Sequence, residues 1–228
     1  MQRIFHTPEG VRDIYSQECS RKQKLQEKLH RVFHQYGFED IETPTFEYFE
    51  VFSKEVGTIP SRELYKFFDR EGNTLVLRPD FTPSVSRACA TYFNPEKEVV
   101  SLCYTGNTFI NNSSFRGRLK ETTQMGVERM GDDSPEADAE ILAMTVECLL
   151  ATGLTEFQVS VGQVDYYKAI FAQTGMSQEE EEELRELISQ KNYFGVEELV
   201  KNKNMDKSLA RVLSQLPQMF GSTEVLEK

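Results

Sequence analysis

Hydrophobic and polar positions along this chain follow two periods, one typical of helices and one typical of strands. Within residues 16–36, apolar side chains recur every three or four positions and Lys and Glu occupy the opposite face, which predicts an amphipathic helix. Ser16 is a candidate N-cap, and Gly37 suits the left-handed residue that commonly ends a helix. The apolar positions of this helix are Leu25, Leu29, Val32, Phe33 and Tyr36.

Strands are predicted by segments with alternating or continuous apolar residues. LYKFFD (64–69) and TLVLR (74–78) predict two strands joined by the turn sequence DREGN. Residues 106–131 predict two longer strands around a polar hairpin loop, and EFQVSVGQ (156–163) alternates in the manner of a further strand. Both helices and strands are therefore expected along the chain.

A strand-to-helix junction is predicted near residue 80. Thr82 and Pro83 have the character of an N-cap and a first helical residue, directly after the strand at 74–78. Asp80 therefore lies where a strand gives way to a helix N-terminus. From the residues alone, we favour a capping role for its carboxylate.

The second half of the chain is predicted to be mainly helical. Ser134, Pro135 and Glu136 open a helix that we expect to end at Gly153. From residue 164 onward the pattern is helical and strongly charged, and the acidic run EEEEE is most simply a solvated helix face. With 228 residues, 39% of them apolar, the chain suits one globular core with a small appendage.

Charge and hydropathy limit the partners and the cellular location that we expect for the protein. The net charge of −11 opposes a phosphate backbone, so we expect no nucleic-acid partner. The basic cluster of Arg116, Arg118 and Lys120 is interpreted as a solvated loop tip. No apolar run approaches the roughly 18 residues that a membrane span needs. The N-terminal sequence has no hydrophobic signal segment, so we expect a cytoplasmic protein with no membrane partner.

Metal, redox and cofactor chemistry finds little support in the sequence. The cysteines are isolated, which indicates buried thiols in a reducing compartment. His30 and His34 stand four apart on the first predicted helix, but no third ligand is visible nearby, so a structural role is favoured and no metal is expected. No GxSxG, Walker lysine loop or glycine-rich dinucleotide motif occurs, so no catalytic residue and no cofactor is predicted. The cysteines are Cys19, Cys89, Cys103 and Cys148.

The second strand of the hairpin carries the most informative pattern. Gln124 and Glu128 lie two steps apart on the same strand face, with Gly126 between them. An amide and a carboxylate then flank a gap without a side chain. Such a gap suits a small ligand that carries an ammonium group.

Several segments of this chain resemble the core of the class II aminoacyl-tRNA synthetases, specifically the histidyl-tRNA synthetases. TPEGVRD, YGFEDIETPTFE, LRPDFT, GRLKETTQMGVE and PEADAEI occur in the order that this family shows. The resemblance implies an α+β fold, with an antiparallel sheet flanked by helices in residues 1–163, followed by a helical insertion in residues 164–228. It also implies a homodimer built on residues 40–56 with the preceding helix.

The amino-acid side of the family's pocket is retained in this resemblance. By their positions in LRPDFT and in the second strand of the hairpin, four residues are expected to bind the amino acid, with histidine as the ligand. The departures are Asp80, where the family has glutamate, and Phe81, where it has glycine. The expected ligand-binding residues are Asp80, Thr82, Gln124 and Glu128.

The ATP side of the pocket departs from the family. Ile110 stands where synthetases carry an arginine for the α-phosphate, Asn112 where they carry a glutamate, and Thr122 where they carry an adenine-stacking phenylalanine. The third signature motif and the anticodon-binding domain are not found in this sequence. We therefore expect a truncated form that lacks amino-acid activation.

The run YKFFDREGNTLVLRPDFTPSVSR is closer to a paralogous family, the regulatory subunits of ATP phosphoribosyltransferase. This resemblance implies a noncatalytic protein of histidine biosynthesis that assembles with a short-form catalytic subunit, activates it and helps to sense histidine. Two alternatives stay open. One is a catalytic-core fragment of a histidyl-tRNA synthetase, and the other is a free-standing histidine-binding module with an unrelated partner.

Overall fold

The computed structural model describes residues 6–53, 59–112, 117–203, 207–216 and 221–224. The chain divides into two compact units, residues 1–158 and 159–228. The structure thus places the division before Val159, whereas the sequence interpretation placed it before Val164.

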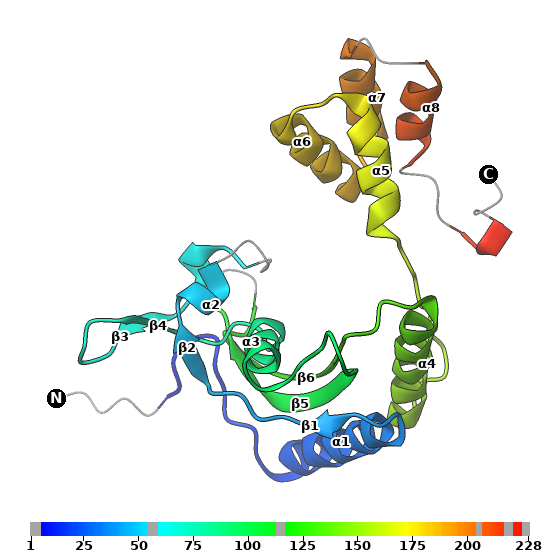
Figure 1. Cartoon of the computed structure of the whole chain (residues 1–228). Helices are drawn as coiled ribbons and strands as arrows, with labels where there is room; N and C mark the ends of the chain where they lie inside the picture. Colours follow the sequence, from blue (N-terminus) through cyan, green and yellow to red (C-terminus); the bar gives the residue numbers. More distant parts are fainter. Residues whose placement is uncertain (1–5, 54–58, 113–116, 204–206, 217–220, 225–228) are drawn as a thin grey trace. The chain divides into compact units, whose positions relative to one another are not determined.

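The first unit is built around a three-stranded sheet (Figure 1). Strand β5 (Val100–Phe109) lies in the middle, parallel to the short β1 (Glu39–Asp40) and antiparallel to β6 (Glu121–Met130). The predicted hairpin of residues 106–131 is confirmed by the β5–β6 pairing, and β5 begins earlier, at Val100.

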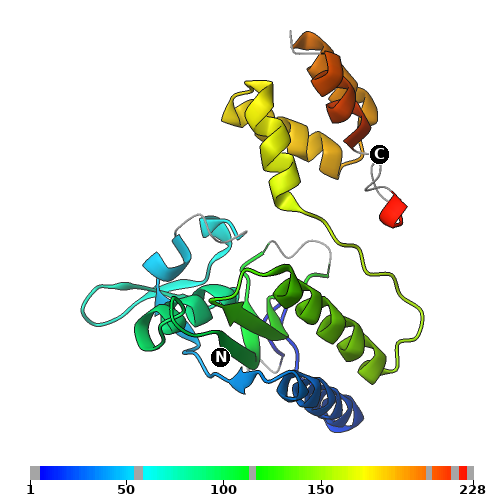
Figure 2. The same ribbon diagram turned by 45° about the vertical axis from the view of Figure 1, so that its right-hand side comes forward.

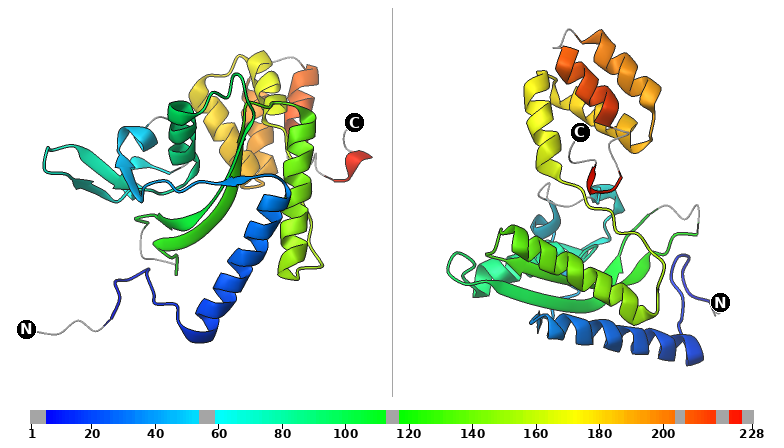
Figure 3. Two further views of the ribbon diagram at one scale, coloured as in Figure 1. Left: turned by 60° about the horizontal axis from the view of Figure 1, so that its bottom comes forward. Right: turned by 90° about the vertical axis from the view of Figure 1, so that its right-hand side faces the viewer.

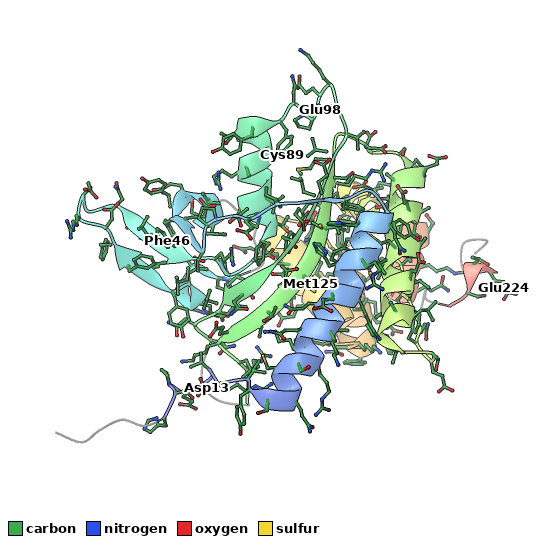
Figure 4. The ribbon with its side chains drawn as sticks, turned by 90° about the horizontal axis from the view of Figure 1, so that it is seen from below. Asp13, Phe46, Cys89, Glu98, Met125 and Glu224 are labelled. Atoms are coloured by element: carbon green, nitrogen blue, oxygen red, sulfur yellow. The ribbon has the colours of Figure 1, made fainter. Side chains whose placement is uncertain are left out.

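Helices cover both faces of this sheet. α3 (Thr82–Tyr92) packs on one face, while α1 (Ser16–Gln35) and α4 (Pro135–Thr152) lie side by side on the other (Figure 3). Because side chains alternate along β5, its residues divide between the two cores. Val100, Leu102 and Tyr104 contact the α3 side, and Cys103 contacts the α1 side. Figure 4 labels Cys89 on α3 and Met125 on the α1 side of β6.

A second three-stranded sheet precedes α3. Its order is β2 (Phe46–Tyr48), β4 (Thr74–Leu77) and β3 (Lys66–Phe68), all antiparallel, so the two predicted strands around DREGN are confirmed. The short helix α2 (Glu50–Ser53) and the 3-10 turn η1 (Ser61–Glu63) flank this sheet.

The ion pair between Glu47 and Arg87 links the small sheet to α3, with 2.7 Å between Oε1 and Nη2. Strand β4 leads into α3 through only four residues, Arg78 to Phe81. The start of α3 is therefore held close to the small sheet.

The predicted helix ends are confirmed in part. Gly37 has a φ of 80°, and α4 runs between a Ser134 cap and a left-handed Gly153. Ser16 is not the N-cap of α1; Tyr15 occupies that position without a side-chain hydrogen bond. Likewise Thr82 is the first residue of α3 and Phe81 its N-cap. The Thr82 hydroxyl bonds to the Glu128 carboxylate of β6.

The strand predicted at residues 156–163 is wrong, because this segment has no strand in the structure. A strand needs a neighbour that satisfies its backbone groups. Within the described residues, neither sheet pairs with this segment, and two of its alternating apolar residues, Val159 and Val161, lie exposed, Val161 at 70%.

The second unit consists of α5 (Val164–Thr174), α6 (Gln178–Ser189), α7 (Tyr193–Asn202) and α8 (Lys207–Gln215) in the described part of the chain (Figure 2). The acidic run opens α6, and Ser177 and Glu180 form a capping box there. No helix in the described ranges is both long enough and apolar enough to cross a membrane. The core of this unit comprises Ile170, Phe171, Leu184, Val196, Val200, Leu213 and Leu216.

Candidate amino-acid-binding site

The candidate site lies on the α3 face of the central sheet. Gln124 and Glu128 pair with Gly106 and Leu102 of β5, and Leu102 packs against α3. The side chains of Gln124 and Glu128 therefore point toward the start of α3, where Asp80 and Thr82 lie.

The structure brings the four predicted residues together as two hydrogen-bonded pairs. Gln124 Nε2 donates to Asp80 Oδ1 at 3.0 Å. The Thr82 hydroxyl donates to Glu128 Oε1 at 2.6 Å. Asp80 Oδ1 also accepts the backbone N–H of Phe81 at 2.7 Å. This bond reaches the N-cap residue of α3, and no described side chain caps the first turn of the helix, so the predicted capping role of Asp80 is wrong.

The gap predicted above Gly126 is not open, because Tyr104 fills it. A Cβ atom at Gly126 would lie 2.4 Å from the Tyr104 hydroxyl oxygen. That hydroxyl donates to Glu128 Oε1 at 3.4 Å. The close approach of the Tyr104 phenol therefore requires glycine at position 126. A ligand would have to lie beside this phenol, next to Asp80, Thr82, Gln124 and Glu128.

Phe81 completes the packing around Tyr104. The two rings stack with centroids 4.3 Å apart, and the guanidinium carbon of Arg78 lies 4.0 Å from the centre of the Phe81 ring. The Arg78 guanidinium donates hydrogen bonds to the backbone carbonyl oxygens of Asn107 and Thr43, at 2.8 and 2.9 Å. The sequence analysis identified Phe81 as a departure from the family's glycine but missed Arg78 and Tyr104.

The register of the hairpin is the signal that identifies Tyr104. Tyr104 pairs directly with Gly126, so a large side chain faces an absent one. The sequence alone does not give this register, because it does not show which residues pair on either side of the hairpin loop.

The two carboxylates give the site its electrostatic character. Burial, with a smaller contribution from the charge of Asp80, raises the pKa of Glu128, although the hydrogen bonds from Thr82 and Tyr104 act in the opposite direction. Burial and the nearby carboxylates also raise the pKa of Tyr104.

Each carboxylate keeps one oxygen available within the described part of the chain. No hydrogen bond between described residues reaches Asp80 Oδ2 or Glu128 Oε2, and no described Lys or Arg forms an ion pair with either group. A partly buried carboxylate without a cation favours a positively charged ligand, so this arrangement suits an ammonium group.

Three uncharged residues, Ile110, Asn112 and Thr122, occupy the phosphate side of the predicted pocket. Ile110 follows β5, and its N–H donates to the Lys120 carbonyl at 2.9 Å. The Thr122 hydroxyl lies 3.0 Å from that of Thr108, and Asn112 Nδ2 donates to the Leu119 carbonyl at 3.4 Å. None of these three side chains supplies the positive charge that a phosphate requires.

The predicted basic cluster of the hairpin loop is only partly within the described residues. Arg116 lies outside them, while Arg118 is exposed. The backbone N–H of Lys120 donates to the Gly10 carbonyl at 2.7 Å.

A family model described as histidyl-tRNA synthetase matches residues 10–228. The chain belongs to the histidyl-tRNA synthetase family. The class II synthetase-like α+β fold expected from the sequence is thereby confirmed. Asp80, Thr82, Gln124 and Glu128, here called the quartet, form the two hydrogen-bonded pairs described above.

Relatives within the histidyl-tRNA synthetase family carry a more specific name. A protein of Acetivibrio thermocellus called ATP phosphoribosyltransferase regulatory subunit is 42% identical over 98% of this chain and 54% of its own length. One of Ruminiclostridium cellulolyticum with the same name is 39% identical over the same shares. The chain thus spans about half the length of these curated relatives.

A solved structure agrees with these similarities. The crystal structure of an ATP phosphoribosyltransferase regulatory subunit/histidyl-tRNA synthetase from Bacillus halodurans C matches with a TM-score of 0.87 and 31% identity. The match covers all of this chain and 59% of that one. The regulatory-subunit resemblance noted from the sequence is therefore confirmed at the level of relatives.

Proposed function

We propose that this protein is a noncatalytic regulatory subunit that assembles with a catalytic ATP phosphoribosyltransferase subunit, activates it in the first step of histidine biosynthesis and senses histidine. The relatives named above support this role, and so does their identity over nearly the whole chain. Since the chain covers only about half of those relatives, the role is proposed for the whole protein.

One observation supports the proposal independently of the relatives' names. The amino-acid side of the pocket keeps its carboxylates, whereas Ile110, Asn112 and Thr122 on the phosphate side carry no charge. Asp80 and Glu128 lie beside their hydrogen-bonding partners, and Ile110 takes the place of the phosphate-binding arginine. A pocket of this kind suits binding of an amino acid without its activation. This combination favours a sensor over a fragment of an active synthetase.

Co-purification tests the assembly. The protein, at its full natural length, is expressed in its host with an affinity tag, and the catalytic subunit is expected to elute with it in a fixed ratio on size-exclusion chromatography. The same protein without the catalytic subunit in the host serves as the control. Elution without that subunit would contradict the proposal and favour a free-standing binding module.

Histidine is expected to bind weakly at the quartet, with a Kd between millimolar and high micromolar, about −4 to −6 kcal/mol. Its ammonium group would contact the available oxygens of Asp80 and Glu128. We expect Asp80→Ala and Glu128→Ala each to weaken binding by about tenfold or more, because hydrogen bonds to charged groups typically contribute about 1.5–3 kcal/mol. Calorimetry measures this effect, with Glu71→Ala in the exposed turn as a matched control.

If both site variants bind histidine as the parent does, the assignment of the pocket is wrong. Glu128→Gln refines the test. The raised pKa means that the folded state holds the Glu128 proton more tightly than the unfolded chain does, so the stability contribution is present at low pH and is lost as the pH rises through the folded pKa. Glu128→Gln is therefore expected to raise the unfolding temperature at pH 7 while it weakens histidine binding. A fall in both would indicate a purely structural role.

A homodimer is expected to form through residues 40–56. Phe46 and Tyr48 of β2 are 50% and 55% exposed, and Phe46 meets the neighbouring Phe67 edge to face at 5.7 Å. Adjacent exposed aromatic side chains commonly mark an interface. Light scattering is expected to give about twice the chain mass of 26.3 kDa.

Phe46→Glu should shift this mass toward the monomer, because a carboxylate would be buried in the interface. Tyr92→Glu on α3 is the matched control, since Tyr92 is exposed at 76% and lies outside this surface. A parent mass of about 26.3 kDa at high concentration, or equal effects of the two variants, would refute the interface.

A further inference from the structure

Two histidines of α1 lie beside two further potential metal ligands on the sheet. His30 and His34 are one helical turn apart, so their side chains share a face of α1. The chain turns at Gly37 and enters β1, whose last residue is Asp40. Strand β1 pairs with β5 in parallel, and this register places Asp40 opposite Cys103. The fold therefore supplies the third and fourth ligands that spacing along the sequence does not reveal.

The four groups converge within a small volume. His30 Nε2 lies 2.6 Å from Asp40 Oδ1, and His34 Nε2 lies 3.0 Å from Asp40 Oδ2. The Cys103 thiol donates to Asp40 Oδ1 at 3.5 Å. One ligand atom from each of the four residues lies within 4.8 Å of the others. The two imidazole rings are 4.1 Å apart between centroids.

Two features of this cluster are not needed for hydrogen bonding at a protein surface. Cys103 is only 1% exposed and belongs to the core between the sheet and α1, yet its sulfur points to a carboxylate. Both imidazoles present the same ring nitrogen, Nε2, to that carboxylate. The buried thiol lines the inner side of the cluster, while the imidazoles and the carboxylate reach solvent, which provides an entry path for an ion.

We propose that His30, His34, Asp40 and Cys103 bind a divalent transition-metal ion of the zinc class in a four-coordinate site. Two imidazoles, one carboxylate and one thiolate match the ligand types that zinc accepts, and sulfur and nitrogen donors disfavour calcium and magnesium. The Cys103 thiol proton passes to solvent on binding, and the ion takes the place of the contacts that now hold the four groups together.

The metal would connect three elements of the first unit. His30 and His34 belong to α1, Asp40 to β1 and Cys103 to β5. Cys103 faces α1 and α4, whereas the histidine pocket lies on the α3 face of the same sheet. The proposed site is thus separate from the amino-acid site, and an ion there would fix the first helix on the sheet.

Cobalt(II) titration of the purified 228-residue chain tests the site, because cobalt replaces zinc and reports its ligands by absorption. We expect one equivalent to produce the visible bands of a four-coordinate ion and a near-ultraviolet band from sulfur, and zinc to displace both signals. Cys103→Ser should abolish the sulfur band. His34→Gln and Asp40→Asn should each weaken zinc binding by at least about tenfold. Even mutations of residues that only hydrogen-bond to metal ligands typically lower metal affinity by about 10–100-fold.

Cys148→Ser and His6→Gln are matched controls, since these residues lie outside the cluster, and both should behave as the parent. Circular dichroism establishes that each variant is folded, and Asp40→Asn, which is exposed on the sheet edge, keeps the test decisive if Cys103→Ser does not fold. Absence of a cobalt spectrum in the parent would overturn the proposal. So would binding that Asp40→Asn and His34→Gln leave unchanged.

Discussion

Histidine-dependent exchange of pyrophosphate into ATP is expected to be absent for this protein. In an active synthetase, a positive side chain stabilises the α-phosphate as the carboxylate attacks it. Here the corresponding position holds Ile110, and the nearby Thr108 and Thr122 hydroxyls bond to each other. Removing one pre-organised contact to a developing charge typically lowers a rate by about 10²–10³-fold, and three positions have changed together.

The exchange assay uses an active histidyl-tRNA synthetase as the positive control under identical conditions. Ile110→Arg is expected not to restore exchange, because Asn112 and Thr122 still lack the groups that position ATP in the family. Exchange by the parent chain at rates near those of the synthetase would end the noncatalytic interpretation. A high rate in Ile110→Arg alone would show that the other two positions are dispensable.

Local sequence signals predicted those parts of the fold that depend on local chemistry. The apolar period of α1, the Ser134 cap and the Gly153 stop each involve residues within one or two helical turns. The prediction of Ser16 as the N-cap was wrong by one residue, because Tyr15 occupies that position. The strand at 156–163 failed because alternation shows only that a segment can pair, and pairing needs a neighbouring strand.

In the candidate site, too, features set by local sequence were predicted and features set by pairing between distant segments were missed. The shared face of Gln124 and Glu128 comes directly from strand periodicity, and it was predicted correctly. Tyr104 was missed because its place over Gly126 depends on the register of β5 and β6 across a long loop. The meeting of α1 with Cys103 depends on pairing between β1 and β5, residues more than sixty positions apart, which no local pattern contains.

Activation of a catalytic ATP phosphoribosyltransferase subunit is the second large effect expected. No segment of the sequence resembles a phosphoribosyl-diphosphate site, with its acidic pair and phosphate-binding loop of small residues. Under the proposed function, the protein would affect this reaction through its partner. Histidine at Asp80 and Glu128 can regulate that partner only if it binds the two states of the complex with different affinity. A coupling of about 1–3 kcal/mol, or about 5- to 150-fold in affinity, is typical of such regulation.

The rate of phosphoribosyl-ATP formation is the measurement that decides whether the protein has the proposed regulatory role. The catalytic subunit is assayed alone, with the protein at its full natural length, and with the Glu128→Ala variant, each with and without histidine. We predict that the protein alone is inactive, that the mixture is much faster than the catalytic subunit alone, and that histidine inhibits the mixture less when Glu128 is replaced. A catalytic rate that does not change on addition of the protein, together with no complex on size-exclusion chromatography, would contradict the regulatory role.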